Sequence, residues 1–362
     1  MKNRLSLLGL TALTVILVLS ITRCGGGGDG GVAIPCGDNE AVYVRMDADD
    51  SNPGTISKPL RTIQAAVACA APGKDIRVAN GTYETDSNSG TFIYLDEGKS
   101  IYGGFSSDFQ VRDPAVYTTI INDVTDLSSQ YFSETSALKS NISTTHATVF
   151  DGFTINGATG NQGGVLAAIT VEGSPTISNN IINGGGAYFG EGRGIRIIQG
   201  DPIIKDNTID GGGGKNNKGI HIIQGGPIIK DNTINRGSGD YGYGIAADLI
   251  FSPFTVENNT ITFGTGYGGT GIIVRQASSG IFIISNNSIT GNGISSYGSG
   301  IKFSGEALGL IIEANTISLY CGAGSGIEIG SGVGEPVIRN NTIKTDCGVY
   351  GIDNFANSNI SN

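Results

Sequence analysis

An internal repeat begins near residue 150 and runs to the end of the chain. Two markers recur in step, an Asn-Thr-Ile-like segment and a Gly-Ile pair, and the first has a period of 25 to 28 residues. A period of this length indicates a repeat architecture in which each unit stacks on its neighbour. The segments end at Ile155, Ile182, Ile209, Ile234, Ile261, Ile289, Ile317 and Ile343, and the pairs begin at Gly194, Gly219, Gly244, Gly271, Gly300, Gly326 and Gly351.

The residues within each repeat predict strands. Short apolar runs alternate, as in Ile195-Arg196-Ile197, and Gly, Asn and Asp separate them where tight turns need a left-handed backbone. The chain has 59 Gly in 362 residues but no Gly-X-Y period, and 38% of it is hydrophobic, which excludes collagen and general disorder. Leucine-rich repeats and propellers are disfavoured because the leucine pattern and Trp are missing. The repeat therefore predicts an all-β parallel solenoid with one coil per unit.

Stacking places each register of a coil about 4.8 Å above the same register of the coil before it. The Ile that ends each segment should therefore join an inward aliphatic stack. The Asn two residues earlier should join an internal amide ladder that satisfies the backbone groups of the turns. The expected ladder consists of Asn180, Asn207, Asn232, Asn259, Asn287, Asn315 and Asn341.

The repeat resembles that of right-handed parallel β-helices, the single-stranded solenoids of the pectate-lyase-like class, over roughly residues 76–362. The right hand is implied by this resemblance, because periodicity alone does not fix it. Segments such as Pro72-Gly73 and Asn80-Gly81-Thr82-Tyr83 also resemble the N-terminus shared by an uncharacterised β-helix family and some pectate lyases. The repeat stops before another Asn-Thr-Ile is complete, so we expect an incomplete last coil.

An open solenoid end exposes unpaired strand edges, so residues 34–75 should form an N-terminal cap. Leu60, Ile63, Val67 and Ala70 follow helical spacing between Pro59 and Pro72. This pattern predicts an amphipathic capping α-helix over about residues 59–71.

Residues 1–23 have the organisation of a signal peptide, with Lys2 and Arg4 before an apolar run. The sequence around Cys24 resembles a bacterial lipobox, which implies lipidation of Cys24 and attachment to a membrane there. Arg23 replaces the usual small residue, and an ordinary signal peptide or an uncleaved anchor is the alternative. Residues 24–33 are rich in Gly and predict a flexible tether. We expect an exported bacterial lipoprotein at the outer membrane or cell surface.

The charge balance limits the partners. The net charge is −10, and removal of residues 1–23, which carry three basic and no acidic residues, makes it −13. Such an acidic body disfavours nucleic acid and anionic lipid as partners.

Four further cysteines suggest two disulfides. Cys321 and Cys347 each lie four residues after a repeat Ile, so stacking places them within bonding range on neighbouring coils. We also expect Cys36 to bond Cys69 and tie the first strand to the capping helix, which an exported location permits.

The outer columns of the repeat suggest no catalytic constellation. The residue after each Gly-Ile varies in sign, as is typical of a solvated face, and the only histidines, His146 and His221, have no apparent partner for a nucleophilic triad. His146 lies in a polar excursion at about residues 126–147, which is either a functional loop or a disordered insertion. The column reads Arg196, His221, Ala246, Ile273, Lys302, Glu328 and Asp353.

A sharper alternative comes from polysaccharide lyases of this fold, which use carboxylates to hold calcium and Arg or Lys as a base. The resemblance makes Lys205 or Lys230 the candidate base. The acids that would lie near a calcium ion are Asp201, Asp206, Asp231 and Asp248, of which Asp206 and Asp231 are more simply turn residues.

We therefore expect a non-catalytic surface protein that binds a glycan or an envelope or host component. No cofactor or metal is expected under this interpretation, and the absence of Trp argues against an aromatic sugar platform. The rival hypothesis is a calcium-dependent polysaccharide lyase or related carbohydrate-active enzyme. The ligand and the oligomeric state stay open.

Overall fold

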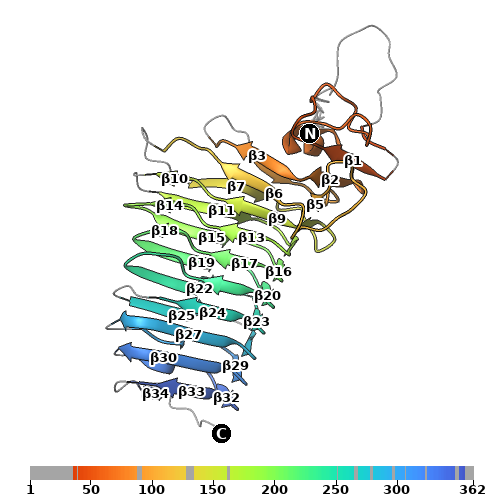
Figure 1. The fold of residues 1–362 in the computed structure, drawn as a ribbon. Helices are drawn as coiled ribbons and strands as arrows, with labels where there is room; N and C mark the ends of the chain where they lie inside the picture. Colours follow the sequence, from red (N-terminus) through yellow and green to blue (C-terminus); the bar gives the residue numbers. More distant parts are fainter. Residues whose placement is uncertain are drawn as a thin grey trace, which may run out of the picture.

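The computed structural model describes residues 36–38, 40–87, 92–127, 134–160, 164–250, 252–264, 268–277, 280–295, 298–305, 307–322, 324–346 and 350–354. They form a right-handed parallel β-helix, as predicted. The coils stack from the N-terminal cap at one end to β34 at the other (Figure 1). All pairings between neighbouring named strands are parallel.

Three long sheets run along the axis, and we name each after its first strand. The β1 sheet contains β1(Ala41–Val44), β2(Asp75–Ala79), β5(Ile101–Phe105), β8(Val149–Asp151), β12(Thr176–Ser178), β16(Ile203–Lys205), β20(Ile228–Lys230), β23(Thr255–Glu257), β26(Ile281–Ser285), β29(Gly309–Glu313) and β32(Val337–Arg339). The β3 sheet contains β3(Gly81–Thr85), β6(Thr119–Asp123), β9(Phe153–Asn156), β13(Ile181–Asn183), β17(Thr208–Asp210), β21(Thr233–Asn235), β24(Thr260–Phe263), β27(Ser288–Ser295), β30(Thr316–Gly322) and β33(Thr342–Thr345).

The β4 sheet contains β4(Ile93–Leu95), β7(Glu134–Ser140), β11(Val165–Val171), β15(Glu191–Ile197), β19(Asn216–Ile222), β22(Tyr241–Ile250), β25(Gly268–Ala277), β28(Ile301–Phe303), β31(Ser325–Ile329) and β34(Tyr350–Asn354). A short fourth sheet, the β10 sheet, contains β10(Thr159–Gly160), β14(Gly186–Ala187) and β18(Gly213–Gly214). Each coil thus contributes one strand to each long sheet.

The repeat Ile residues fill the core as predicted. From Ile155 to Ile317 they are at most 1% exposed, and Ile343 is partly buried. The second marker is explained by contact with the first. A Cβ on Gly219 would lie 2.4 Å from Ile234 Cγ2 and 2.7 Å from the carbonyl oxygen of Gly244, and the same clash recurs at the other Gly-Ile pairs up to Gly326. Glycine is required there because the stacked Ile of the same coil occupies the space of a side chain.

The inner amide ladder lies along the turn between the β1 and β3 sheets. Each Asn from Asn180 to Asn315 donates its Nδ2 to the Oδ1 of the next ladder Asn, at 2.9 to 3.1 Å. The same Oδ1 accepts the backbone N–H of the preceding ladder Asn. The residue before each ladder Asn has a φ of 53° to 57°, a left-handed conformation that Asn and Asp tolerate and that Ala314 also adopts. The ladder therefore satisfies the buried turn backbone of each coil.

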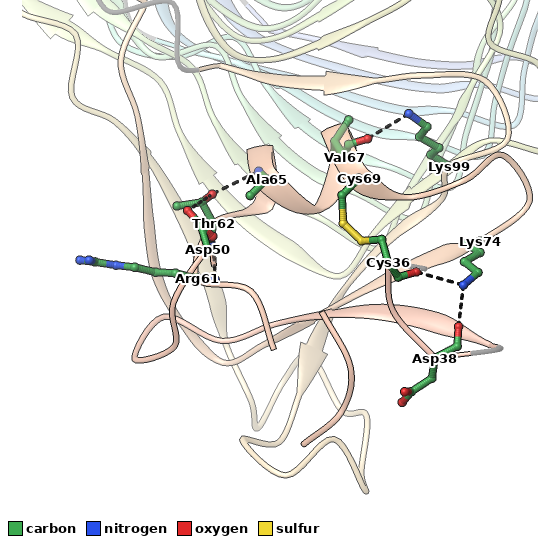
Figure 2. The surroundings of a disulfide bond; sticks show 10 residues. All are labelled: Cys36, Asp38, Asp50, Arg61, Thr62, Ala65, Val67, Cys69, Lys74 and Lys99. Carbon is green, nitrogen blue, oxygen red and sulfur yellow. Dashed lines mark hydrogen bonds between the residues drawn. A yellow bond between two sulfur atoms is a disulfide. The ribbon is translucent and has the colours of Figure 1, made fainter. Parts of the chain in front are cut away.

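The capping helix is shorter than the sequence predicted. The helix α1(Ile63–Cys69) covers seven residues instead of 59–71, because Leu60 is already extended and bridges Val44. Thr62 is the N-cap, and its Oγ1 accepts the N–H of Ala65 at 3.2 Å (Figure 2). The cap also contributes β1, which pairs with β2 and so extends the β1 sheet.

The Cys36–Cys69 disulfide is confirmed, with a Cα–Cα distance of 5.7 Å. It joins the segment before β1 to the end of α1 (Figure 2). Lys74 Nζ supports that segment by donating to the carbonyl oxygens of Cys36 and Asp38, at 3.0 and 2.7 Å. Cys347 lies outside the described residues, as do residues 1–23, Cys24 and the tether, so the second disulfide, signal peptide and lipidation stay predictions. Within the described part of the chain, no helix is long and apolar enough to cross a membrane.

The polar excursion is not a free loop over its described part. Residues 134–140 form β7, which pairs with both β4 and β11 in the β4 sheet. His146 follows in a turn segment, where its Nε2 lies 2.7 Å from the carbonyl oxygen of Asp201. The regular coil therefore includes residues 134–140 of this segment.

Candidate functional site

A group of charged side chains gathers on the β4 sheet, and we call it the charged cluster. Neighbouring strands bring its members together, because Arg193 pairs with Lys218 and Arg196 pairs with His221 across β15 and β19. These residues flank the Gly-Ile pairs of their coils. The cluster consists of Glu134, Glu191, Arg193, Arg196, Lys218, His221, Asp248 and Arg275.

Three members of the charged cluster are buried. Arg193 is 5% exposed, Lys218 4% and His221 5%. The sequence interpretation of this face as solvated is therefore wrong at His221, and the Arg196 side chain next to it is only 13% exposed. Burial of several cations is costly unless each finds a partner.

Glu191 is the partner of two of these cations. Its Oε2 accepts a hydrogen bond from Lys218 Nζ at 3.1 Å and another from Arg193 Nη2. Burial alone would raise the pKa of Glu191, but the charges of Lys218 and Arg193 outweigh it and lower that pKa. Burial lowers the pKa of Lys218 and of Arg193.

His221 has a partner that the sequence did not reveal. Its Nε2 lies 2.6 Å from Asp248 Oδ2, and Arg275 Nη1 donates to Asp248 Oδ1 at 2.5 Å. Burial lowers the pKa of His221 to about 4, so the imidazole is neutral at neutral pH. The hydrogen bonds from His221 and Arg275 lower the pKa of Asp248. Asp248 is therefore ionised, and the His221 proton is on Nε2.

Buried donors in the charged cluster lack hydrogen-bond partners. Arg193 Nε and Nη1 are buried without one, although Nη2 of the same guanidinium holds Glu191. An unsatisfied buried donor costs roughly 1–3 kcal/mol, and more when it is charged. Because both nitrogens are buried, they add positive charge to the charged cluster without offering a contact at the surface.

The charge balance of the cluster favours an anion. Four cations (Arg193, Arg196, Lys218 and Arg275) accompany three carboxylates (Glu134, Glu191 and Asp248), and His221 is neutral. The chain as a whole carries a net charge of −10. A local cationic excess on so acidic a protein, with the Arg275 side chain 36% exposed, can bind a carboxylate or sulfate group.

The lyase alternative does not assemble in the described residues. Lys205 and Lys230 lie on β16 and β20 of the β1 sheet, away from the β4 sheet that carries the charged cluster, and Lys205 Nζ lies 3.5 Å from Asp206 Oδ2. Asp206 and Asp231 both have a φ of 57° and occupy turns. Where the structure describes the chain, no three His, Cys, Asp or Glu side chains form a group that could hold a metal ion.

Asp201 and Asp248 are also engaged elsewhere. Asp201 Oδ1 accepts the N–H of Gly226 at 2.7 Å, whereas Asp248 holds His221 and Arg275. The four candidate acids are therefore divided between turns and the charged cluster.

A different column of the repeat contains the signal for this site. The residue directly before each Gly-Ile pair runs Arg193, Lys218, Tyr243, Thr270, Ser299, Ser325 and Tyr350. Two adjacent cations followed by small or aromatic residues distinguish two coils from the others. Arg275 completes the group from the next strand, with its guanidinium carbon 4.7 Å from the centroid of the Tyr243 ring.

Comparison with known proteins adds a family. A family model described as "Protein of unknown function (DUF1565)" matches residues 46–354. No curated protein matches the sequence.

Several solved structures are similar to this chain at low identity. The enzymatically active domain of tailspike protein 2 from bacteriophage CBA120 has 10% identity and a TM-score of 0.47, over 86% of this chain and 47% of that domain. This chain thus spans about half the length of that domain. The A-module of the Azotobacter vinelandii mannuronan C-5 epimerase AlgE4 has 13% identity and a TM-score of 0.45, over 88% and 100%. Pectate lyase Pel9A has 12% identity and a TM-score of 0.43, over 89% and 81%.

Proposed function

Because the chain belongs to the DUF1565 family, whose description assigns no activity, we propose a function from its own side chains: it binds an anionic polysaccharide at the charged cluster without cleaving it. One observation carries the proposal. Four cations accompany three carboxylates in the charged cluster of a chain whose net charge is −10, and the Arg275 side chain is 36% exposed. A sugar carboxylate or sulfate would bind to this cationic excess with charge-assisted hydrogen bonds.

A polymer fits the site better than a single small anion. The charged cluster extends over β7, β15, β19, β22 and β25 of the β4 sheet, of which the last four belong to successive coils and β7 is separated from β15 by β11. The coils rise by about 4.8 Å each. A polysaccharide with an acid group on each sugar presents anions at a repeat of similar size, so several acid groups can meet cations on neighbouring coils at once.

Burial of the candidate base within the charged cluster argues against cleavage there. His221 is neutral and its Nδ1 carries a free lone pair, as a general base requires. However, this Nδ1 atom is buried, and His221 as a whole is only 5% exposed. A substrate carbon must come within hydrogen-bonding reach of the base to lose its proton, which this position does not allow.

Affinity electrophoresis through gels that contain polygalacturonate, alginate or neutral dextran tests the proposal. We expect retardation by the two acidic polymers, and loss of it on Arg193→Met, which keeps the length of the side chain and removes its charge. Arg339→Met is the matched control, because Arg339 pairs with Glu313 on the β1 sheet and is 52% exposed. Retardation that survives Arg193→Met in a protein of unchanged melting temperature would refute the site.

The same polymers separate binding from lyase activity. A lyase would produce an unsaturated sugar that absorbs in the ultraviolet. The absorbance is therefore followed both with and without added calcium. Appearance of that product, and its loss on Lys205→Met or Lys230→Met, would replace our proposal with the enzymatic one.

We also propose that the protein is exported and anchored through lipidated Cys24. The support is the signal-like segment 1–23 and the Gly-rich residues 24–33 that follow it. Mass spectrometry of the mature protein should show a diacylglyceryl group on an N-terminal Cys24, and Cys24→Ala should release the protein from the membrane fraction. A mature protein that begins elsewhere would refute the anchor.

A further inference from the structure

Two aromatic side chains project from the turn between β14 and β15. Tyr188 is 75% exposed and Phe189 is 72% exposed, and their rings pack edge to face with centroids 4.8 Å apart. Each exposed ring lacks the roughly 2 kcal/mol of hydrophobic stabilisation that its burial would contribute. An exposed pair of this kind marks an interaction surface more often than a scattered single residue does.

The aromatic turn is adjacent to the charged cluster. β15 begins at Glu191, two residues after Phe189, and Glu191 is the residue that holds Arg193 and Lys218. β14 and β18 both contact β15. The β10, β14 and β18 strands lie on the side of the solenoid where β11, β15 and β19 run (Figure 1).

The surface beside the aromatic turn has almost no side chains. β14 is Gly186–Ala187, and its neighbour β18 is Gly213–Gly214. Gly213 is not required by the fold, since its φ is not in the left-handed region and a Cβ there would meet nothing closer than 3.7 Å. A glycine that packing does not demand, next to exposed rings, leaves the backbone open to close approach by a ligand.

We propose that Tyr188 and Phe189 stack on a sugar ring of the polysaccharide whose acid groups bind the charged cluster. This inference rests on the proposed function and extends it to the uncharged face of the polymer. The faces of aromatic rings carry negative charge density and attract the weakly positive C–H groups of a pyranose. Tyr and Phe thus supply the platform that the lack of Trp made unexpected.

Continuity with the charged cluster identifies the occupant as a sugar. An acidic polysaccharide needs contacts of two kinds, ionic for its acid groups and apolar for its rings, and the two lie within a few residues here. A bilayer is a poorer occupant, because the charged cluster beside the rings would lose its hydration against the acyl chains.

Phe189→Trp provides a direct probe, because the chain has no Trp and the introduced indole would be its sole source of indole fluorescence. We expect its emission to shift to shorter wavelength as polygalacturonate or alginate is titrated in. Tyr350→Trp is the matched control, since Tyr350 is 70% exposed but lies in the last described coil. Its emission should not respond. A silent Phe189→Trp probe in a protein that the same polymer still retards would overturn the inference and leave the proposed function standing.

Two further variants measure the contribution to affinity. Tyr188→Ala with Phe189→Ala, and separately Gly213→Val, should weaken binding of the polymer about tenfold, with no change in melting temperature. Retardation that is lost only on Arg193→Met, and not in these variants, would limit the site to its ionic part and refute the stacking. Failure of the unmodified protein to bind either polymer would instead refute the proposed function.

The Phe189→Trp probe also tests the other occupants. An emission shift with phosphatidylcholine and phosphatidylglycerol vesicles but not with polysaccharide would assign the turn to a membrane. A shift that depends on protein concentration, together with a dimer in analytical ultracentrifugation, would assign it to a second copy of the chain. Either result would overturn the proposal.

Discussion

Asn232→Ala should destabilise the solenoid far more than Asn341→Ala, although both remove one member of the same ladder. Asn232 is 2% exposed and lies within the ladder, whereas Asn341 is partly buried in the last coil of the ladder. Water can replace lost hydrogen bonds only at the second position. The comparison therefore isolates the cost of burial from the chemistry of the substitution.

The size of the effect follows from the bonds of Asn232. Its Oδ1 accepts the backbone N–H of Asn207 at 3.0 Å, and its Nδ2 donates to the carbonyl oxygens of Ile204 and Lys230 at 2.9 and 2.8 Å. The substitution leaves the buried Asn207 N–H without an acceptor, which lowers the free energy of unfolding by roughly 1–3 kcal/mol. It also removes further hydrogen bonds that contribute about 1 kcal/mol each. We expect a loss of about 4 kcal/mol for Asn232→Ala and about 1 kcal/mol for Asn341→Ala.

Urea unfolding followed by circular dichroism measures both variants. In a solenoid each coil contacts only its neighbours, so Asn232→Ala should also split the transition as the coils on either side unfold separately. Equal losses for the two variants, or a loss below about 1 kcal/mol for Asn232→Ala, would show that the ladder contributes no more than exposed amides do.

Three other predictions concern protonation, the cap and the core. His221 has a pKa of about 4 in the folded protein against about 6.5 in the unfolded chain. Between these pH values the unfolded chain binds a proton that the folded protein does not. The free energy of unfolding should therefore fall by about 3 kcal/mol as the pH drops from about 6.5 to 4. His221→Gln should abolish that slope in urea titrations at several pH values. Cys36 and Cys69 are 33 residues apart, and replacing both by Ser should lower the free energy of unfolding by about 3–4 kcal/mol when the cap unfolds together with the coils. The loss is measured as a lower midpoint of urea unfolding. Gly219→Ala should lower the melting temperature, whereas Gly213→Ala should leave it unchanged, and equal effects would contradict the packing explanation.

The periodic part of the structure could be predicted from the sequence because each coil repeats the same constraint. Asn207, Asn232 and Asn259 occur at one register and make the same bonds, so their spacing alone located the ladder. The Ile stack and the glycines that face it followed for the same reason. The helix bounds were less predictable, because Leu60 has a helical spacing but forms a β-bridge instead.

One column of the repeat shows Arg193 and Lys218 on adjacent coils, but the repeat could not predict the burial and pairing of the charged cluster. Asp248 and Arg275 lie outside the column that begins with Arg196 and His221, and the His221 bond to Asp248 joins two different registers on adjacent coils. Whether a charged side chain is solvated or buried depends on the loops around it, which vary from coil to coil. Only three-dimensional packing shows that Arg193 and Lys218 are covered.

The amide ladder gives the solenoid a direction. In the Asn-to-Asn bonds, each Asn from Asn180 to Asn315 donates to the next ladder Asn toward the C-terminal end, so the side-chain dipoles of successive coils point the same way and polarise one another. A coil inserted with the opposite direction along the axis would place the amide donors of two ladder Asn side chains opposite each other. Duplication or deletion of a whole coil in register would leave the hydrogen bonds of the ladder intact. The length of such a solenoid can therefore change in whole coils without breaking the ladder.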